Sequence, residues 1–328
     1  MNYRTLGKTG FEVSEVSLGT WQVGGKWGTP WSDETADRII NAAIDAGVNF
    51  IDTADVYSSG LSEAAVARVV KSRSELVRIA TKCGRKVNPH VAAGYTPEAL
   101  KGFVEDSLRN MGVEALDLIQ LHCPPTDVYY KPEIFGLFDR LKQEGKVLNL
   151  GVSVEKVEEA IKAIQYPNVT TVQIIFNMFR HRPAELFFKL AEEQNVGVIV
   201  RVPLASGLLT GKLSSDTAFA EDDHRNFNRD GASFDKGETF SGVDYETGLR
   251  AVEGLKRLFP GAENLAPWAL RWILMFGQVS CIIPGASRVE HVLSNISATE
   301  LPTLTEEQME GVAEIYEAYI KGHVHQVW

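Results

Sequence analysis

Four side chains that could move a proton together stand near the ends of apolar runs in the first 122 residues. Asp52, Lys82 and His122 each close such a run, and Tyr57 follows the aspartate by five positions. A free tyrosine, with a pKa of about 10, donates slowly at neutral pH, and a neighbouring ammonium stabilises its phenolate. We therefore predict that Lys82 lowers the pKa of Tyr57, that Asp52 keeps Lys82 charged, and that His122 orients a substrate carbonyl. Since none of these groups supplies electrons, a cofactor must provide hydride.

Each of these residues also has a purely structural explanation. A buried lysine is costly unless it is paired, so Asp52 and Lys82 could form only a structural ion pair. His122 could be a satisfied core residue, and Tyr57 a surface aromatic. A different chemistry is also open, a Schiff-base aldolase in which Lys82 is the nucleophilic amine. That alternative leaves Tyr57 without a role, so convergence of all four residues favours proton donation.

The elements that must bring these side chains together are short Val- and Ile-rich runs separated by amphipathic stretches. Eight runs read as strands, at residues 16–19, 48–53, 77–82, 115–122, 147–153, 171–177, 197–203 and 279–284. Most are apolar throughout, which is typical of parallel strands buried on both faces. Strand followed by helix, repeated eight times, predicts an α/β fold of the (β/α)₈ TIM barrel type, with its chemistry at the carboxyl ends of the strands. A doubly wound sheet is disfavoured because no Gly-rich turn follows the first strand.

The sequence also predicts where helices begin and which segments lie outside the eight repeats. Ser32, Thr96 and the capping-box pair Thr305 and Gln308 are predicted to begin helices, the last of them an extra C-terminal helix outside the eight repeats. Residues 3–15 read as an N-terminal β-hairpin. The 328 residues could form two domains, but the pattern favours one barrel domain over residues 1–328. The polar stretch 214–245 is either a lid or pocket wall, or an insertion without a role.

Composition narrows the function further. The chain has 33 Lys and Arg against 43 Asp and Glu, a formal charge of −10, which argues against nucleic-acid binding. The three cysteines form no C-x-x-C pair and read as buried hydrophobes, and we expect no metal. Residues 206–212 only superficially resemble a phosphate-binding loop. We find neither a signal peptide nor an apolar run that would span a bilayer, and expect a cytoplasmic protein with no membrane partner.

Ordered segments of the chain resemble the aldo-keto reductase family over nearly the whole length. They are Arg4-Thr5-Leu6-Gly7, Leu18-Gly19-Thr20-Trp21, the run from Phe50 to Tyr57 with Ser62-Glu63, Lys82, Leu121-His122, Gly151-Val152-Ser153, Val172-Gln173, Pro203-Leu204 through Gly211-Lys212, and Ile282-Ile283-Pro284-Gly285-Ala286. The resemblance implies that Asp52, Tyr57, Lys82 and His122 form a catalytic tetrad. It also implies NADP(H) as the preferred cofactor, with NAD(H) as the alternative, bound extended across the barrel mouth.

The resemblance assigns cofactor contacts to particular positions. Ser153 and Gln173 would bind the nicotinamide carboxamide, residues 204–212 would fold over the pyrophosphate, and residues 285–295 would hold the adenosine. Ser287 and Arg288 are placed for a 2′-phosphate, which a guanidinium binds well. The full set of implied cofactor contacts is Gly19, Thr20, Trp21, Asp52, Ser153, Gln173, Arg201, Pro203, Leu204, Ser206, Gly207, Leu209, Gly211, Lys212, Gly285, Ser287, Arg288, His291 and Asn295.

Three positions depart from the family pattern. Val154 stands where Asn is common, Arg201 stands where an aromatic ring often stacks on the nicotinamide, and His291 replaces Gln or Arg near the adenosine. A guanidinium plane could stack in place of the aromatic ring.

The substrate is expected to be a small carbonyl compound or alcohol. Trp21, Trp27, Tyr57 and His122 would contact it. A third hypothesis is a non-enzymatic nicotinamide-binding subunit that senses redox state for a partner. The sequence does not indicate the oligomeric state.

Overall fold

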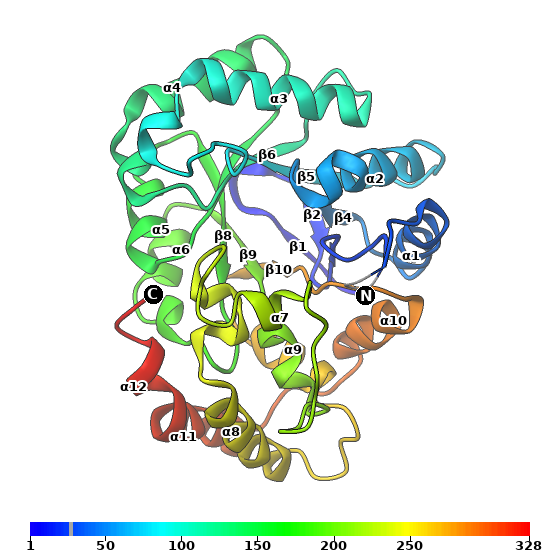
Figure 1. The fold of residues 1–328 in the computed structure, drawn as a ribbon, viewed down its shortest axis with the longest axis vertical. Coiled ribbons are helices and arrows are strands. Elements are labelled where there is room, and N and C mark those ends of the chain that lie inside the picture. Colours follow the sequence, from blue (N-terminus) through cyan, green and yellow to red (C-terminus); the bar gives the residue numbers. More distant parts are fainter. Residues whose placement is uncertain (26–28) are drawn as a thin grey trace.

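The computed structural model describes residues 1–25 and 29–328, so the predicted substrate contact Trp27 lies outside the described residues. One parallel sheet has the strand order β10-β9-β8-β7-β6-β5-β4-β3. Bridges between Val16 and Ile282 and between Gly19 and Gly285 join its two ends and close it into a barrel (Figure 1). The strands are β3 (Leu18–Gly19), β4 (Phe50–Asp52), β5 (Arg78–Cys83), β6 (Leu118–His122), β7 (Leu150–Ser153), β8 (Val169–Ile175), β9 (Gly197–Arg201) and β10 (Val279–Ile282). The predicted (β/α)₈ barrel is confirmed.

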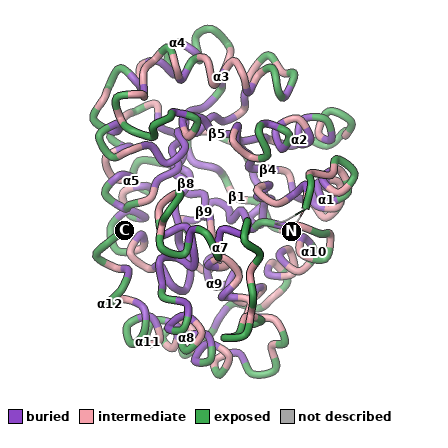
Figure 2. Tube along the Cα trace, in the orientation of Figure 1, coloured by how far each residue is buried: buried purple, intermediate pink, exposed green. Residues whose placement is uncertain are grey.

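The strands form the buried centre of the molecule, as their composition predicted. Every residue of β6, β7, β8 and β9 is buried, and Figure 2 shows the barrel strands mostly in purple. Alternate side chains of a strand point inward. An interior cluster that includes Phe50, Leu118 and Ile199 fills the barrel. Apolar side chains thus pack on both faces of the sheet.

The N-terminal hairpin, made of β1 (Tyr3–Thr5) and β2 (Glu12–Ser14), is present as predicted. Its Leu6 and Val13 are fully buried and join the interior cluster, so the hairpin covers the amino-terminal end of the barrel. Gly7 at its turn has a φ of +48°, and a Cβ there would lie 2.1 Å from the backbone nitrogen of Gly197. The close approach of hairpin and barrel therefore requires glycine.

Helices surround the sheet and start where the sequence signals predicted. Ser32, Thr96 and Thr305 accept hydrogen bonds from the backbone at the starts of α1, α3 and α11, and Thr305 forms a full capping box with Gln308. The helices are α1 (Asp33–Asp45), α2 (Leu61–Lys71), α3 (Pro97–Met111), α4 (Pro132–Gln143), α5 (Val157–Ala163), α6 (Phe187–Glu193), α7 (His224–Phe227), α8 (Tyr245–Leu258), α9 (Ala266–Leu274), α10 (Val289–Ile296), α11 (Glu306–Ile315) and α12 (Lys321–Val324). The extra C-terminal helix is α11, which packs against α8. None of the helices in the described part of the chain is long and apolar enough to cross a membrane.

The polar stretch 214–245 packs against the carboxyl end of the barrel. It contains α7, and Figure 1 shows this segment in yellow-green beside β9. Asn228 is fully buried and its side-chain oxygen accepts the N–H groups of Ser233 and Phe234, both at 2.9 Å. The indole of Trp328 donates a hydrogen bond of 2.7 Å to Asp235. From residue 223 onward the segment is therefore a packed wall, tied down both internally and by the C-terminal tail, whereas residues 214–222 are mostly exposed.

Candidate active site

Strand register brings the predicted acid and lysine together. Asp52 ends β4 beside β5, and Lys82 on β5 is only 1% exposed. The Lys82 ammonium donates to the Asp52 carboxylate, to the carbonyl oxygen of Thr53 at 2.8 Å, and to the Tyr57 hydroxyl at 3.2 Å. Its three hydrogens thus have three acceptors. The phenol of Tyr57 is the one acceptor among them that also faces the barrel mouth and is half-buried.

Tyr57 is positioned by a tight turn after β4. Its N–H donates to the carbonyl of Ala54 at 3.1 Å, and the next two residues, Ser58 and Ser59, have φ values of +47° and +55°. The ring meets the His122 ring edge-on at a centroid distance of 6.0 Å. His122 ends β6, the strand next to β5. All four predicted residues therefore meet around one point at the mouth.

Two glutamines support this arrangement from inside the barrel. Gln120 and Gln173 donate to the second Asp52 oxygen at 2.9 Å and 2.8 Å, and Gln173 also donates to Gln120 at 3.1 Å. The amide N–H groups of Gln173 are thus used within the protein, and its oxygen accepts from Ser153 at 3.4 Å. Its contact with a carboxamide stays a prediction. The sequence analysis did not predict a role for Gln120, although a polar residue in the middle of an apolar strand could have indicated one.

Burial and neighbouring charges together set the pKa values of Lys82 and Tyr57. Burial alone would lower the pKa of Lys82, but the Asp52 carboxylate and the Tyr57 oxygen raise that pKa above its usual value. Burial also raises the pKa of Tyr57, and the opposing effect of Lys82 is not large enough to reverse this. Lys82 therefore lowers the pKa of Tyr57 as predicted, but the net pKa lies above its usual value, because the prediction left out desolvation of the phenolate.

His122 is a neutral imidazole in this setting. Burial, followed by the charges of Arg85, Lys82 and Arg201, lowers its pKa well below the usual value. Its Nδ1 is buried and has no hydrogen-bond partner among the described residues. A neutral ring keeps one N–H donor and one acceptor nitrogen, so it can donate to a carbonyl oxygen without giving up its proton.

The wall segment 214–245 contributes aromatic and imidazole rings to the mouth. The Trp21 ring lies 6.3 Å from Tyr57, 4.9 Å from His224 and 6.1 Å from Phe234, measured between centroids. His224 and Phe234 were not predicted site residues. Nothing in their local sequence marks them, because their position depends on how the segment folds back over the barrel.

A second charge cluster, which we call the arginine–glutamate cluster, lies beside the first, with two members buried and two half-buried. It consists of Arg85, Glu155, Arg201 and Glu238. Arg85 contacts Glu238 at 2.5 Å and Glu155 at 3.5 Å, and Arg201 contacts Glu155 at 2.8 Å and Glu238 at 3.2 Å. Arg201 also donates to the carbonyl of Val154 at 2.9 Å. Stacking of Arg201 on a nicotinamide remains a prediction, but its guanidinium already has three partners here.

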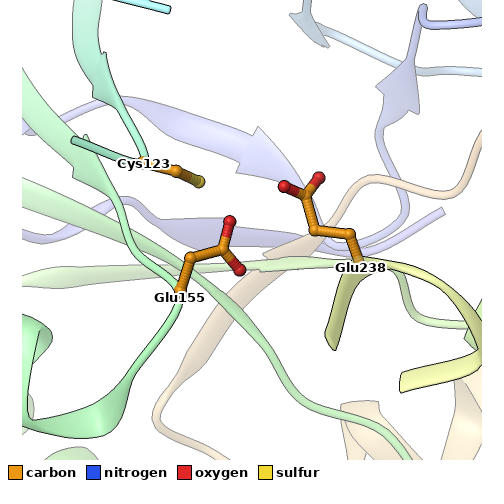
Figure 3. Close-up of side chains that lie close together, drawn as sticks. All are labelled: Cys123, Glu155 and Glu238. Atoms are coloured by element: carbon orange, nitrogen blue, oxygen red, sulfur yellow. The ribbon is translucent and has the colours of Figure 1, made fainter. Parts of the chain in front are cut away.

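The two glutamates of the arginine–glutamate cluster and the neighbouring Cys123 form a potential set of metal ligands. Cys123, Glu155 and Glu238 have ligand atoms within 4.8 Å of one another (Figure 3). Both carboxylates already pair with guanidinium groups, which a cation would have to displace. Burial raises the pKa of the Cys123 thiol, whereas metal binding requires the thiolate. The geometry therefore fits an ion-pair cluster better than a metal site.

The segment predicted to cover a pyrophosphate is a loop of unusual backbone shape. Ala205, Ser206, Gly207 and Gly211 have positive φ values between 46° and 98°. The N–H groups of Ala205 and Gly207 donate within the loop, to the carbonyls of Val202 at 3.1 Å and Leu204 at 2.9 Å, so its contact with a pyrophosphate stays a prediction. Pro203 and Leu209 are buried and hold the loop down, Leu204 is half-buried, and Lys212 is exposed.

In the segment predicted to hold the adenosine, the guanidinium of Arg288 is exposed to solvent. Arg288 is 54% exposed and lies 3.7 Å from Glu290. The backbone N–H of Ser287 donates to the His291 ring at 3.4 Å, and Asn295 closes the loop by donating to the carbonyl of Gly285 at 3.3 Å. A Cβ on Gly285 would meet no atom within 4 Å, so space for a ligand is present there.

Two predicted contacts on the first strand are instead occupied within the protein. The hydroxyl of Thr20 donates to the carbonyl of Asp52 at 3.0 Å and accepts from Ser62 at 2.8 Å. The N–H of Gly19 donates to the carbonyl of Pro284 at 3.1 Å. These groups shape the mouth, and their role as cofactor contacts stays a prediction.

Known proteins resemble this chain in sequence and in fold. The model of the aldo/keto reductase family matches residues 15–317. An NADH-specific methylglyoxal reductase from Escherichia coli is 27% identical over 90% of this chain and 93% of its own, and an NADP(+) aldo-keto reductase from Schizosaccharomyces pombe is 26% identical over 83% and 80%. The solved structure of a glycerol dehydrogenase from Gluconobacter oxydans matches with a TM-score of 0.77 and 30% identity over 97% of this chain and 96% of that one. These relatives thus include proteins named for NADP and for NADH.

Proposed function

We propose, from the premise that this chain belongs to the aldo/keto reductase family, that it is an NADP(H)-dependent oxidoreductase of small aldehydes, ketones or the corresponding alcohols. The observation that carries the proposal is the buried Lys82, which donates to Asp52, to Thr53 and, at 3.2 Å, to the Tyr57 hydroxyl. An ion pair with only a structural role would need no phenol at the barrel mouth. A proton donor would need both the phenol of Tyr57 and the ammonium of Lys82.

Tyr57 would act as the general acid in carbonyl reduction and as the base in the reverse direction. Its raised pKa keeps the phenol protonated at neutral pH, which is the form that donates. When the proton leaves, the ammonium of Lys82 stabilises the oxygen anion that forms, and Asp52 holds that ammonium in place. The neutral His122 would donate an N–H to the carbonyl oxygen and set its orientation.

The residues present fit a dinucleotide. The exposed Lys212 and Arg288 offer positive charge in a chain of net charge −10, and space remains beside Gly285. We propose that Arg288 and Ser287 hold the 2′-phosphate of NADP(H). When bound, the nicotinamide cofactor would supply or accept the hydride.

The Schiff-base alternative is less well supported. A nucleophilic amine must be neutral, yet Lys82 is the donor in three hydrogen bonds and its pKa is raised. Turnover of the purified chain with NADPH and a generic aldehyde would separate the enzyme from a redox-sensing subunit.

The direct test is Tyr57→Phe, which removes only the hydroxyl. We expect carbonyl reduction to fall by several orders of magnitude while NADPH still binds, as measured by fluorescence titration. Turnover close to that of the wild type would contradict the role of Tyr57.

Arg288→Ala tests the cofactor preference in the same titration. We expect the wild type to bind NADPH more tightly than NADH and the variant to lose the difference. An advantage that survives the substitution would place the 2′-phosphate elsewhere.

A further inference from the structure

The arginine–glutamate cluster contains a buried donor without an acceptor. The Nε of Arg201 is buried and has no hydrogen-bond partner among the described residues, and one terminal nitrogen of Arg180, which lies outside the cluster, is in the same state. Both guanidiniums are at least nine-tenths buried, Arg201 at 7% and Arg180 at 3% exposed. Buried N–H groups normally find an acceptor, so this region is short of acceptor atoms.

The two carboxylates of the cluster differ in their pKa values. Burial raises the pKa of Glu155 to about 8, whereas Arg85 and Arg201 hold the pKa of Glu238 well below its usual range despite burial. Both carboxylates nevertheless contact guanidinium groups, so the geometry pairs Arg85 and Arg201 with Glu155 and Glu238. The buried Nε–H of Arg201 remains as a donor that the acceptor atom of a ligand would satisfy.

The arginine–glutamate cluster lies beside the reacting groups. Among charged residues, Arg85 has the largest effect on the pKa of His122. Its guanidinium lies 5.8 Å from the centre of the Phe234 ring, which meets Trp21 edge-on, and Trp21 in turn stacks beside Tyr57. A compound whose carbonyl oxygen lies between Tyr57 and His122 would thus have an aromatic wall on one side and Arg85 near it.

The contact with Glu238 shows that Arg85 binds a carboxylate in this structure. It belongs to the wall segment 214–245, not to the barrel, and its carboxylate contacts both Arg85 and Arg201. A carboxylate supplied by the chain itself therefore occupies the arginines at the mouth. A guanidinium binds carboxylates with matched geometry, and a ligand carboxylate would find the same donors.

We propose that the substrates of this enzyme carry a carboxylate, bound by Arg85 with the unpaired Nε–H of Arg201 as a second donor, in exchange for Glu238. This proposal rests on the proposed function, because it places the carbonyl between Tyr57 and His122. It assigns the substrate class as aldehydes or ketones with a carboxylate at the end remote from the carbonyl.

The test compares two aldehydes of nearly equal size, 4-carboxybenzaldehyde and methyl 4-formylbenzoate, which differ in charge. We expect the wild type with NADPH to reduce the acid with a kcat/KM at least about tenfold higher than that of the ester. Arg85→Gln should remove this preference by raising KM for the acid, with the ester changed less than about threefold. Arg85→Lys keeps a positive charge and should retain part of the preference.

A binding measurement without turnover accompanies the kinetics. Calorimetric titration should show that the wild type binds benzoate more tightly than benzamide and that Arg85→Gln loses the difference. Glu238→Gln should strengthen benzoate binding, because it removes the competing carboxylate. The matched control is Arg73→Gln, a helix-end arginine paired with Asp45 and Glu75, which should change neither kinetics nor binding.

The outcomes separate the two proposals. Equal binding of benzoate and benzamide, or an ester reduced as well as the acid, would overturn carboxylate recognition while leaving the reductase intact. Reduction of neither aldehyde together with selective benzoate binding would support the carboxylate site and count against the proposed reaction.

Discussion

Two charge clusters share the mouth of this barrel, and they are built differently. The cluster of Lys82, Asp52 and Tyr57 is held by β4 and β5, with Gln120 and Gln173 added from β6 and β8. Strand register fixes nearly all of these positions. The arginine–glutamate cluster joins the loops after β5 and β7 and the last residue of β9, Arg201, to Glu238, which lies in the wall segment 214–245.

The difference lies in how completely each cluster satisfies its own polar atoms. In the first cluster, Lys82 has three acceptors and the second Asp52 oxygen has two amide donors. In the second, the buried Nε of Arg201 lacks a partner among the described residues. A satisfied cluster on rigid strands is preorganised for one reaction, whereas an incompletely satisfied one that lies mostly on loops suits a ligand that arrives and leaves.

The largest expected effect is that of Lys82→Met on the first cluster. The variant should lose carbonyl reduction by about 10³-fold or more, since the proton donor loses the ammonium that stabilises its anion. It should also lose about 3–5 kcal/mol of unfolding free energy, because Asp52 is left charged and buried without its partner. Urea unfolding and steady-state kinetics measure the two effects.

The double variant Asp52→Asn with Lys82→Met is the control for that prediction. It removes both charges, so we expect most of the stability to return while activity stays lost. Recovery of activity together with stability would show that the cluster is only structural.

A smaller effect is expected from Gln173→Leu, which removes a donor to Asp52. We expect a loss of about 1–3 kcal/mol in unfolding free energy and a fall in kcat of about tenfold. If Gln173 acts through Asp52, the affinity for NADPH should hardly change; a loss confined to that affinity would favour a carboxamide contact instead. The matched control is Thr170→Val on β8, the strand that also carries Gln173. It removes a hydroxyl that donates to the carbonyl of Leu150 on β7.

A pH-dependent effect of similar size is expected from Asp55, a buried acid outside both clusters. Neither of its oxygens has a hydrogen-bond partner among the described residues, and Lys86 lies 3.7 Å away. Burial raises its pKa to about 7. An acid with a raised folded pKa stabilises the protein fully at low pH and loses that contribution as pH rises from about 4 to 7.

Asp55→Asn should therefore gain stability relative to the wild type between pH 4 and pH 8, by roughly 2–4 kcal/mol. Unfolding free energies in urea at several pH values measure the difference. A difference that stays flat with pH would mean that Asp55 finds a partner for its charge.

The smallest effect is expected from Asn228→Ala in the wall segment. The substitution removes the acceptor of the Ser233 and Phe234 N–H groups, so the segment should open more often. Limited proteolysis between residues 214 and 236 should become faster, with little change in global unfolding. Unchanged cleavage would show that the contacts of Glu238 and Trp328 hold the segment without Asn228.

The sequence predicted the elements well and their ends less well. All eight strands, the hairpin and the helix starts at Ser32, Thr96 and Thr305 are present. The predicted strand 197–203 ends two residues early, at Arg201, because Val202 takes a positive φ of 50° as the chain turns away. Apolar composition marks what is buried, but hydrogen bonding decides where a strand stops.

The sequence by itself determined the barrel and the placing of Asp52, Lys82 and His122 at its mouth, since strand periodicity and the parallel arrangement follow from local pattern. Only the tertiary structure decided the rest. The raised pKa of Tyr57 depends on how many atoms exclude water from the phenol, which no local pattern records. The pairing of Glu238 with Arg85 joins residues 153 positions apart, and it exists only because the wall segment folds back over the barrel.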